Sequence, residues 1–512
     1  MYEEEIFFAR KASGLVRELT PQDAAMWAFG AAAVSGITFY SVRLPYRFPG
    51  GDPTLSFFIT SALLFPSAIV LAMTMGAMPR SGGLYVAISR VLGPEVGFLS
   101  LWSIIIGWGI LLGLWGIVSG RLFGSVFIMG GLVSIGSFLQ SPVGAFIWGI
   151  FWLTVFTAFS MLGIKWIKWI TRITGYIPLF AVIIACIIFI SLGPKGALAA
   201  FGKTWNIDVN ALMSKAAELG YKKPAFSWAA TIASFGTPLW AWTGFEAITY
   251  AGGEVKSPKS SMYGFLGGYI IVWALYTIIP FCLMYAFGDL IGPYNLLFRE
   301  QQDALRTFMP VTEPSVPFFA FSTLGGAVGL IMALAIMMLY LKGIPPVFAA
   351  TSRMFFALGF DRALPTRISE VDARGSPRLA VALMFIIGLF GLIVTTMGVD
   401  AVLGILDYTM LGFFWFLGIT AMLLPIRKKE IYEASPIRGE IAGIPIMTIM
   451  GLLTVVTGFF VAAFSIMEFD YTMATIMAII YGIGFIFYVW QQHKNAKEGI
   501  DTTKIYSTLP PL

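Results

Sequence analysis

One acidic side chain lies in the middle of an apolar segment. Residues 228–251 are long and apolar enough to span a bilayer, yet they contain Pro238, Gly244 and Glu246 near mid-depth. A carboxylate in hydrocarbon costs about 2.5 kcal/mol or more, so it is tolerated mainly where it faces a protein interior or a wet cavity. Glycine permits local unwinding, and unwound backbone at that depth needs polar partners from protein or water. This segment is therefore the first candidate for a binding site.

A second apolar segment has the same character. Residues 24–42 contain Gly30, Ser35 and Gly36, again near the centre. Unwinding there would free backbone N–H groups at Ser35, Gly36 and Ile37, and the positive end of the following half-helix favours a carboxylate. Close packing of helices through small residues is the alternative interpretation of this segment.

The broken segment at 228–251 would attract a group of the opposite charge, a cation. Freed carbonyl groups around Trp242, Thr243 and Gly244 would face a cationic amine. Interrupted spans at corresponding positions of two halves indicate a binding site in inverted-repeat transporters. Together the two breaks would suit a molecule with a carboxylate at one end and an amine at the other.

The rest of the chain predicts the elements that hold these segments. Of 512 residues, 58% are hydrophobic and 12% are charged, about half the charged fraction of soluble domains, which indicates a polytopic membrane protein. A search for apolar stretches of about 20 residues predicts twelve spans, at 24–42, 55–77, 96–119, 144–163, 173–193, 228–251, 263–287, 317–341, 379–397, 401–424, 443–465 and 472–490. Residues 120–143 are interpreted as the outer end of the third span plus a loop.

Composition also excludes several kinds of chemistry. The one histidine, His493, lies in the polar C-terminal tail, so the spans hold no histidine for a metal, a haem or a catalytic triad. Cys186 and Cys282 both lie inside apolar spans and indicate neither a disulfide framework nor a metal cluster. We therefore expect no enzyme, no metal and no cofactor. The N-terminus lacks the features of a signal peptide, and we expect it to be retained.

The distribution of lysine and arginine predicts the orientation. Twelve spans place both termini on one side, and that side then holds 23 of the 33 basic residues, six of them in a loop at 342–378. The positive-inside rule puts this side in the cytoplasm of a multi-pass cell-membrane protein. The same asymmetry explains the net charge of +6, so no nucleic-acid partner is indicated.

The predicted organisation has four parts. Residues 1–23 form a cytoplasmic N-terminus, and residues 24–424 form the transporter core. Within the core, spans 1–5 occupy 24–193 and spans 6–10 occupy 228–424. Spans 11 and 12 occupy 443–490 and have no predicted role, and a cytoplasmic tail covers 491–512. The outer segments 194–227 and 288–316 are expected to be short structured caps.

Three stretches resemble one known family. Segment 235–259, F-G-T-P-L-W-A-W-T-G-F-E-A-I-T-Y-A-G-G-E-V-K-S-P-K, resembles the sixth-helix signature of the amino acid–polyamine–organocation (APC) transporters. Residues 78–102 are similar to the family's loop between spans 2 and 3, and residues 351–377 to its loop after span 8. The three signatures occur in the family's order, and the resemblance covers about the first 425 residues.

The resemblance implies a fold and a substrate. It implies an all-α LeuT-like fold of 5+5 inverted repeats with broken helices 1 and 6, followed by two further helices. It also implies an amino acid as substrate, bound between the broken helices, and alternating access by rocking of helices 1, 2, 6 and 7 against 3, 4, 8 and 9.

The resemblance extends to individual residues of the binding site. The family pattern in span 1 is G-x-x-x-G-x-G-I-F; here Gly30, Gly36 and Ile37 match, whereas Val34 and Thr38 replace the second glycine and the phenylalanine. A bulkier Val34 would narrow the carboxylate site. Trp240 stands where many relatives place an aromatic lid, with interfacial packing as the alternative. The implied substrate-binding residues are Val34, Ser35, Gly36, Ile37, Trp240, Trp242, Thr243, Gly244 and Phe245.

The coupling ion is left open. Some relatives carry a lysine in span 5 that takes the place of a sodium ion, but span 5 here contains none. Na⁺ bound by carbonyls of span 1 and the hydroxyls of Thr351 or Ser352 is one alternative, although such hydroxyls commonly bond within their own helix. A proton carried by Glu246 is another, and that carboxyl would equally serve to hold the break. Asp407 in span 10 either lines the outer vestibule or caps a kink.

Charged loops on the predicted cytoplasmic side are expected to close the inner gate. They must approach one another when that gate shuts, and we expect arginine–carboxylate pairing among them. The candidates are Arg80, Arg90, Glu254, Lys256, Arg353 and Asp361.

The sequence therefore predicts a secondary transporter of amino acids or close amine–carboxylate relatives, driven by H⁺, by Na⁺ or by exchange. A non-transporting amino-acid sensor and a polyamine or organocation exchanger are the alternatives. The expected partners are the small-molecule substrate and the lipid bilayer; monomer and homodimer are equally compatible with the sequence.

Overall fold

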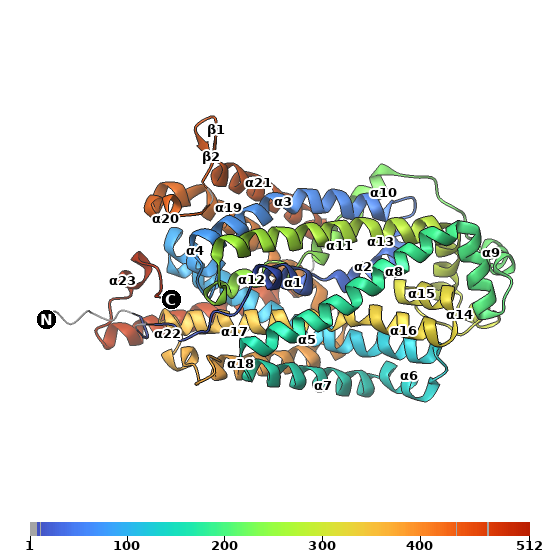
Figure 1. The fold of residues 1–512 in the computed structure, drawn as a ribbon, viewed down its shortest axis with the longest axis horizontal. Helices are drawn as coiled ribbons and strands as arrows, with labels where there is room; N and C mark the ends of the chain where they lie inside the picture. Colours follow the sequence, from blue (N-terminus) through green and yellow to red (C-terminus); the bar gives the residue numbers. More distant parts are fainter. Residues whose placement is uncertain (1–7, 11, 437, 468–470, 512) are drawn as a thin grey trace.

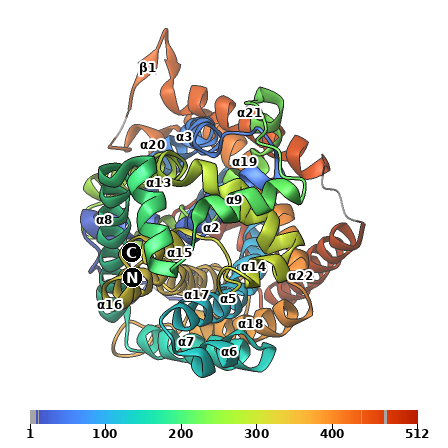
Figure 2. The same ribbon diagram turned by 90° about the vertical axis from the view of Figure 1, so that its right-hand side faces the viewer.

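The protein is a bundle of long helices. The computed structural model describes residues 8–10, 12–436, 438–467 and 471–511. The long helices lie roughly along one axis (Figure 1), with α4, α20 and α23 at one end and α6, α9 and α14 at the other. Viewed along that axis, α5 and α17 lie towards the centre, while α22 and the small β-hairpin lie at the periphery (Figure 2).

The elements of the first half are α1 (Pro21–Ala31), α2 (Val34–Arg47), α3 (Pro53–Ala77), α4 (Leu84–Val91), α5 (Pro94–Met129), α6 (Val133–Gln140), α7 (Pro142–Met161), α8 (Ile164–Trp205) and α9 (Val209–Glu218). The third span continues as one helix to Met129, as predicted for the end of that span. The prediction of a loop after it is wrong in part, because residues 133–140 form the short helix α6. In α8, Gly193 has non-helical torsion angles beside Pro194, so the outer part of this helix is a kinked extension.

The elements of the second half are α10 (Trp228–Ala233), α11 (Gly236–Ala241), α12 (Ala247–Tyr250), η1 (Gly252–Glu254), α13 (Pro258–Glu300), α14 (Gln302–Arg306), α15 (Val316–Leu324), α16 (Gly326–Met337), η2 (Met338–Tyr340), α17 (Ile344–Phe360), η3 (Thr366–Ser369), α18 (Arg378–Met397), α19 (Val399–Arg427), α20 (Lys429–Glu433), β1 (Glu440–Ile441), β2 (Ile444–Pro445), α21 (Ile446–Met467), α22 (Tyr471–Lys497) and α23 (Thr502–Ser507).

The helices confirm a multi-pass membrane protein. Ten helices in the described part of the chain are long and apolar enough to cross a bilayer. The predicted sixth span consists of the short helices α10, α11 and α12, none long enough to cross alone, and the predicted tenth lies within α19. The arrangement of twelve spans as a 5+5 inverted repeat stays a prediction.

The predicted limits of span 8 are wrong. Residues 317–324 belong to the separate helix α15, which ends at Gly325 with a positive φ of 65°. The membrane-length helix runs instead from Gly326 to Phe360, and it leaves α-helical geometry at η2 and the turn at 341–343 before α17 begins. In the segment 342–378 that was assigned to a cytoplasmic loop, residues 344–360 therefore form a buried helix.

Helix packing forms a core around the first span. α1 packs against α13, α8 and α12, while α5 packs against α7 and α18. α17 contacts both α5 and α12. The two interrupted spans thus lie inside the bundle, with α5 and α17 beside them.

Candidate binding site

Span 1 is interrupted by two alanines. α1 ends at Ala31 and α2 begins at Val34, because Ala32 has an extended ψ of 138° and Ala33 a ψ of 49°. The break was expected at Ser35 to Ile37; those residues instead form the first turn of α2. Their backbone N–H groups are at the start of a helix that has no side-chain cap, where the helix dipole favours an anion.

Span 6 is interrupted at the expected residues. α11 ends at Ala241 and α12 begins at Ala247, and residues 242–246 form turns between them. Gly244 has a φ of 94°, a left-handed conformation that L-residues with side chains rarely adopt. The glycine supplies the conformation that the break requires.

The two breaks contact each other directly. The backbone N–H of Ala33 donates to the carbonyl of Ala241 at 2.9 Å. A Cβ added at Gly244 would lie 2.7 Å from the carbonyl oxygen of Ala31, and one added at Gly36 would lie 2.9 Å from the indole of Trp240. The interrupted backbones and the Trp240 ring therefore form one contiguous cluster in the bundle interior.

Replacing Gly244 with alanine should destabilise this contact. The substitution combines the strain of a positive φ with the approach to Ala31, and we expect a loss of about 1–3 kcal/mol in unfolding free energy. Gly131→Ala is the matched control, since Gly131 has a φ of 84° but no atom within 4 Å of an added Cβ. Thermal unfolding of both purified variants separates strain from contact, and equal losses would contradict the role of the Ala31 approach.

Lys342 lies at the break of span 1, and it was not among the residues predicted for the site. Its side chain is buried, and Nζ donates to the carbonyls of Phe29, Gly30 and Ala32 at 2.6, 2.7 and 2.8 Å. The last carbonyls of a helix lack intrahelical partners and carry the negative end of its dipole. Nζ also lies 4.6 Å from the centre of the Phe29 ring, a cation–π contact. The ammonium group therefore holds the end of α1 at the break.

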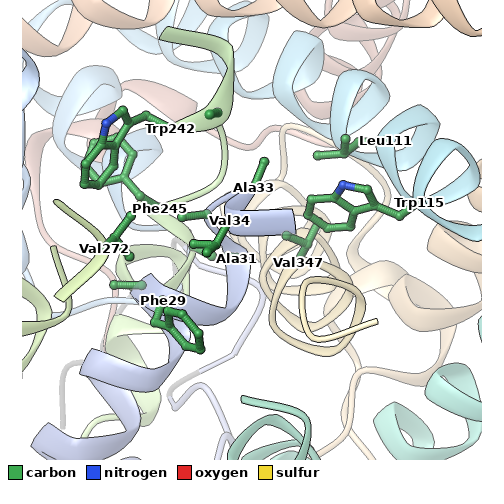
Figure 3. Packing of buried hydrophobic residues seen from close by; sticks show 14 of the residues in the cluster. Phe29, Ala31, Ala33, Val34, Leu111, Trp115, Trp242, Phe245, Val272 and Val347 are labelled. Carbon is green, nitrogen blue, oxygen red and sulfur yellow. The ribbon is translucent and has the colours of Figure 1, made fainter. Parts of the chain in front are cut away.

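Figure 3 shows the apolar residues around the span 1 break. Ala33 and Val34 lie between Phe245 on one side and Leu111 and Trp115 of α5 on the other. An added Cβ at Gly343, next to Lys342, would lie only 2.5 Å from the Trp115 ring. Helix α5 and the interruption of span 8 thus pack tightly beside the break.

The side chains around the span 6 break have different partners. Trp242 donates from Nε1 to Ser61 Oγ at 3.0 Å and stacks on Tyr269 with ring centres 4.0 Å apart. This indole is therefore held by α3 and α13. Thr243 is buried and its hydroxyl has no hydrogen-bond partner among the described residues.

Glu246 is fully buried beside the same break. Neither carboxylate oxygen makes a hydrogen bond of normal geometry within the described part of the chain, although the backbone N–H groups of Gly244 and of Glu246 itself lie beside it. The roles of proton carrier and of backbone support both stay predictions. The second predicted acid, Asp407, lies in α19, but its side chain is outside the described residues.

The hydroxyls predicted to bind sodium are engaged within α17. Thr351 Oγ1 donates to the carbonyl of Val347 at 2.8 Å and Ser352 Oγ to that of Ala349 at 2.7 Å. The carbonyls of span 1 that were expected to complete the sodium site accept instead from Lys342. Sodium binding by Thr351 and Ser352 remains a prediction that these contacts do not favour.

Four of the six predicted inner-gate charges form two ion pairs. Arg353 binds Glu254 through Nε and Nη2 at 2.8 and 2.9 Å, with both side chains fully buried. Arg90 pairs with Asp361, also buried. Burial lowers the pKa of Arg90, but the Asp361 carboxylate together with Tyr85 and Tyr506 raises it above its ordinary value, so the guanidinium stays charged. Lys256 is exposed, and its backbone N–H donates to the carbonyl of Leu19.

Arg80 has a different partner, the carbonyl of Pro510 in the C-terminal tail. The three elements that carry the paired charges, α4, η1 and α17, come together at the end of the bundle that also carries α23. Their action as a gate stays a prediction.

Comparison with known proteins places the chain in a family. A family model described as "Amino acid permease" matches residues 19–486, which includes both interrupted spans, Lys342 and the two buried ion pairs. The chain is also 27% identical over 240 residues to the serine/threonine exchanger SteT of Bacillus subtilis (strain 168). That match covers 46% of this chain and 48% of the relative, so it spans about half of either protein. The chain therefore belongs to the amino acid permease family, which is part of the APC superfamily.

Proposed function

We propose that this protein is a secondary transporter that moves amino acids across the cell membrane by alternating access, with both termini in the cytoplasm. The observation that carries the proposal is the direct contact of the two interrupted spans through Ala33 and Ala241. At the start of α2 the Gly36 N–H already donates to the carbonyl of Ala33 at 2.7 Å, so the N–H groups of Ser35 and Ile37 are the ones that suit the carboxylate of an amino acid. The carbonyl groups of residues 242–244 suit its ammonium group, although those of Trp242 and Gly244 also accept a backbone N–H. Both ends of one substrate would thus bind to backbone.

The surroundings favour a small substrate. The indole of Trp240 lies directly over Gly36, and its ring packs edge-on against Tyr40 with centres 5.7 Å apart. Val34 adds bulk at the start of α2, and Trp115 occupies the side near Gly343. SteT is a serine/threonine exchanger, and we extend that preference for small side chains to this protein as part of the proposal.

The coupling proposal rests on Lys342. The Lys342 Nζ already donates to the carbonyls at the end of α1, so a sodium ion there would compete with the lysine for the same oxygens. We therefore propose transport that does not require Na⁺ and is driven by H⁺ or by exchange.

Uptake into proteoliposomes tests the function. We expect labelled serine, threonine or alanine to accumulate with a pH gradient or with preloaded amino acid, and equally with and without Na⁺. Gly36→Leu should reduce uptake at least about tenfold, because its side chain would displace Trp240 and occupy the carboxylate site. Gly267→Leu is the matched control, since nothing lies within 4 Å of an added Cβ there.

Other outcomes identify the alternatives. Binding without uptake or exchange would indicate a sensor, and uptake of a labelled polyamine in place of amino acids would indicate an organocation exchanger. A strict requirement for Na⁺ would overturn the coupling proposal and favour the predicted sodium site at Thr351 and Ser352.

A further inference from the structure

The C-terminal tail is packed into the end of the bundle that carries the two buried ion pairs. The tail is defined here as residues 501–511, which include α23. Ile505 is fully buried and Tyr506 is 7% exposed, although the flanking Lys504 and Ser507 are exposed. A short amphipathic segment that buries two large side chains in this way is docked on the surface beneath it.

Arginines of the predicted gate hold the tail by its backbone. Arg90 donates from Nε to the carbonyl of Thr508 at 3.2 Å and from Nη2 to that of Ile505 at 3.5 Å, and its guanidinium lies 5.2 Å from the centre of the Tyr506 ring. Arg80 donates from Nε to the carbonyl of Pro510 at 2.5 Å. Arg90 is the same residue that pairs with Asp361, so the tail and the ion pair share one cation.

The tail reaches across elements that belong to different parts of the bundle. The Tyr506 hydroxyl contacts that of Tyr85 in α4 at 3.5 Å. Pro510 and Pro511 line a cavity of about 20 Å³ together with Ser81, Gly253, Phe360 and Asp361. These residues come from the loop after α3, from η1 and from the end of α17. The tail therefore covers the junction between the sixth-span elements and the eighth-span helix.

We propose that the C-terminal tail is a lock on this end of the transporter: it must leave the junction before α4, η1 and α17 can separate. The proposal rests on alternating access, because only a transporter that opens at this end needs such a release. A tail held by backbone carbonyls and two buried side chains can be released as a unit without breaking the Arg353–Glu254 pair. Transport at this end is therefore limited by tail release.

Thiol labelling tests the lock without any substrate. Replacing Cys186 and Cys282 with serine and Ser81 with cysteine leaves one reporter in the cavity beneath Pro510 and Pro511. In purified protein in detergent, we expect a hydrophilic maleimide to react with this cysteine at least about tenfold faster after truncation at Gly499 or in Ile505→Asp. Ser507→Ala is the matched control, since its side chain is exposed and the lock does not use it.

Each outcome decides the question. Restored protection when a synthetic peptide of residues 500–512 is added to the truncated protein would support the lock. A labelling rate that changes less than twofold in both Ile505→Asp and Tyr506→Ala, in monodisperse protein with an unchanged melting temperature, would overturn it. These point variants decide the matter in the same way if the truncated chain does not stay monodisperse.

The transport assay separates this inference from the proposed function. Truncation should increase the initial rate of uptake several-fold. If no amino acid is transported by any variant while labelling follows the tail as expected, the proposed function fails and the lock stands. If uptake is normal and labelling ignores the tail, the lock fails and the proposed function stands.

Discussion

Lys342→Met is expected to abolish transport and to lower the stability of the protein. Methionine preserves the length of the apolar stem but leaves the carbonyls of Phe29, Gly30 and Ala32 without the ammonium that satisfies them. Each buried acceptor left unpaired costs about 1–3 kcal/mol, and the end of α1 would move away from the span 6 break. We expect uptake to fall at least about a hundredfold and the unfolding free energy to fall by about 2 kcal/mol or more.

The matched control is Lys259→Met, the same change at an exposed lysine at the start of α13. A second variant tests the charge itself. In Lys342→Ala, either ethylammonium or Na⁺ in the medium should restore part of the uptake, because each places a cation among the same carbonyls. Wild-type uptake and stability in Lys342→Met would show that the ammonium group has no role in the site.

Breaking the buried pair of Arg353 and Glu254 should have the largest effect on stability. Both side chains are fully buried and joined by two hydrogen bonds, and removing one partner leaves an uncompensated charge, which costs about 3–5 kcal/mol. The backbone carbonyl of Glu254 also accepts from Glu18 and Leu19, so the loss would loosen the N-terminal segment. Thermal unfolding of Glu254→Leu and Arg353→Met measures the effect.

The double variant Glu254→Leu/Arg353→Met sharpens the test. Replacing both charges with apolar side chains should recover most of the stability, since the desolvation of two ions is then avoided. The exposed pair of Lys215 and Glu218, with side chains 44% and 66% exposed, is the control, and Lys215→Met should cost less than about 1 kcal/mol. Equal losses at the two pairs would contradict the importance of burial.

The interruption of span 6 could be predicted from the sequence because the residue types at the break suit the backbone geometry that the fold requires there. Gly244 is required for the left-handed turn, and Glu246 is a polar group that a plain span would not carry. In span 1 the residue types at the break do not indicate the backbone geometry. Ala32 and Ala33, where the helix breaks, are the best helix formers, and contacts with the distant residues Ala241 and Lys342 help to hold them in non-helical geometry. The break was therefore predicted about three residues too late.

Lys342 could not be recognised from hydropathy. A span predicted from apolar residues ends at the first strong charge, and this rule placed Lys342 in a cytoplasmic loop. The structure shows a helix that loosens at 338–343 and continues through Pro345 and Pro346 to Phe360. The prolines favour the start of a new helix, a signal that could have placed the lysine at an interruption inside the membrane. Its carbonyl partners lie about 310 residues away in the chain and required the fold.

Contact between the interrupted spans is made by main-chain atoms of two alanines. Mutations that exchange one small residue for another at these two positions leave the bonded atoms in place. An evolving lineage can therefore alter the walls contributed by α5 and α17 while the contact between the two interrupted spans is inherited unchanged.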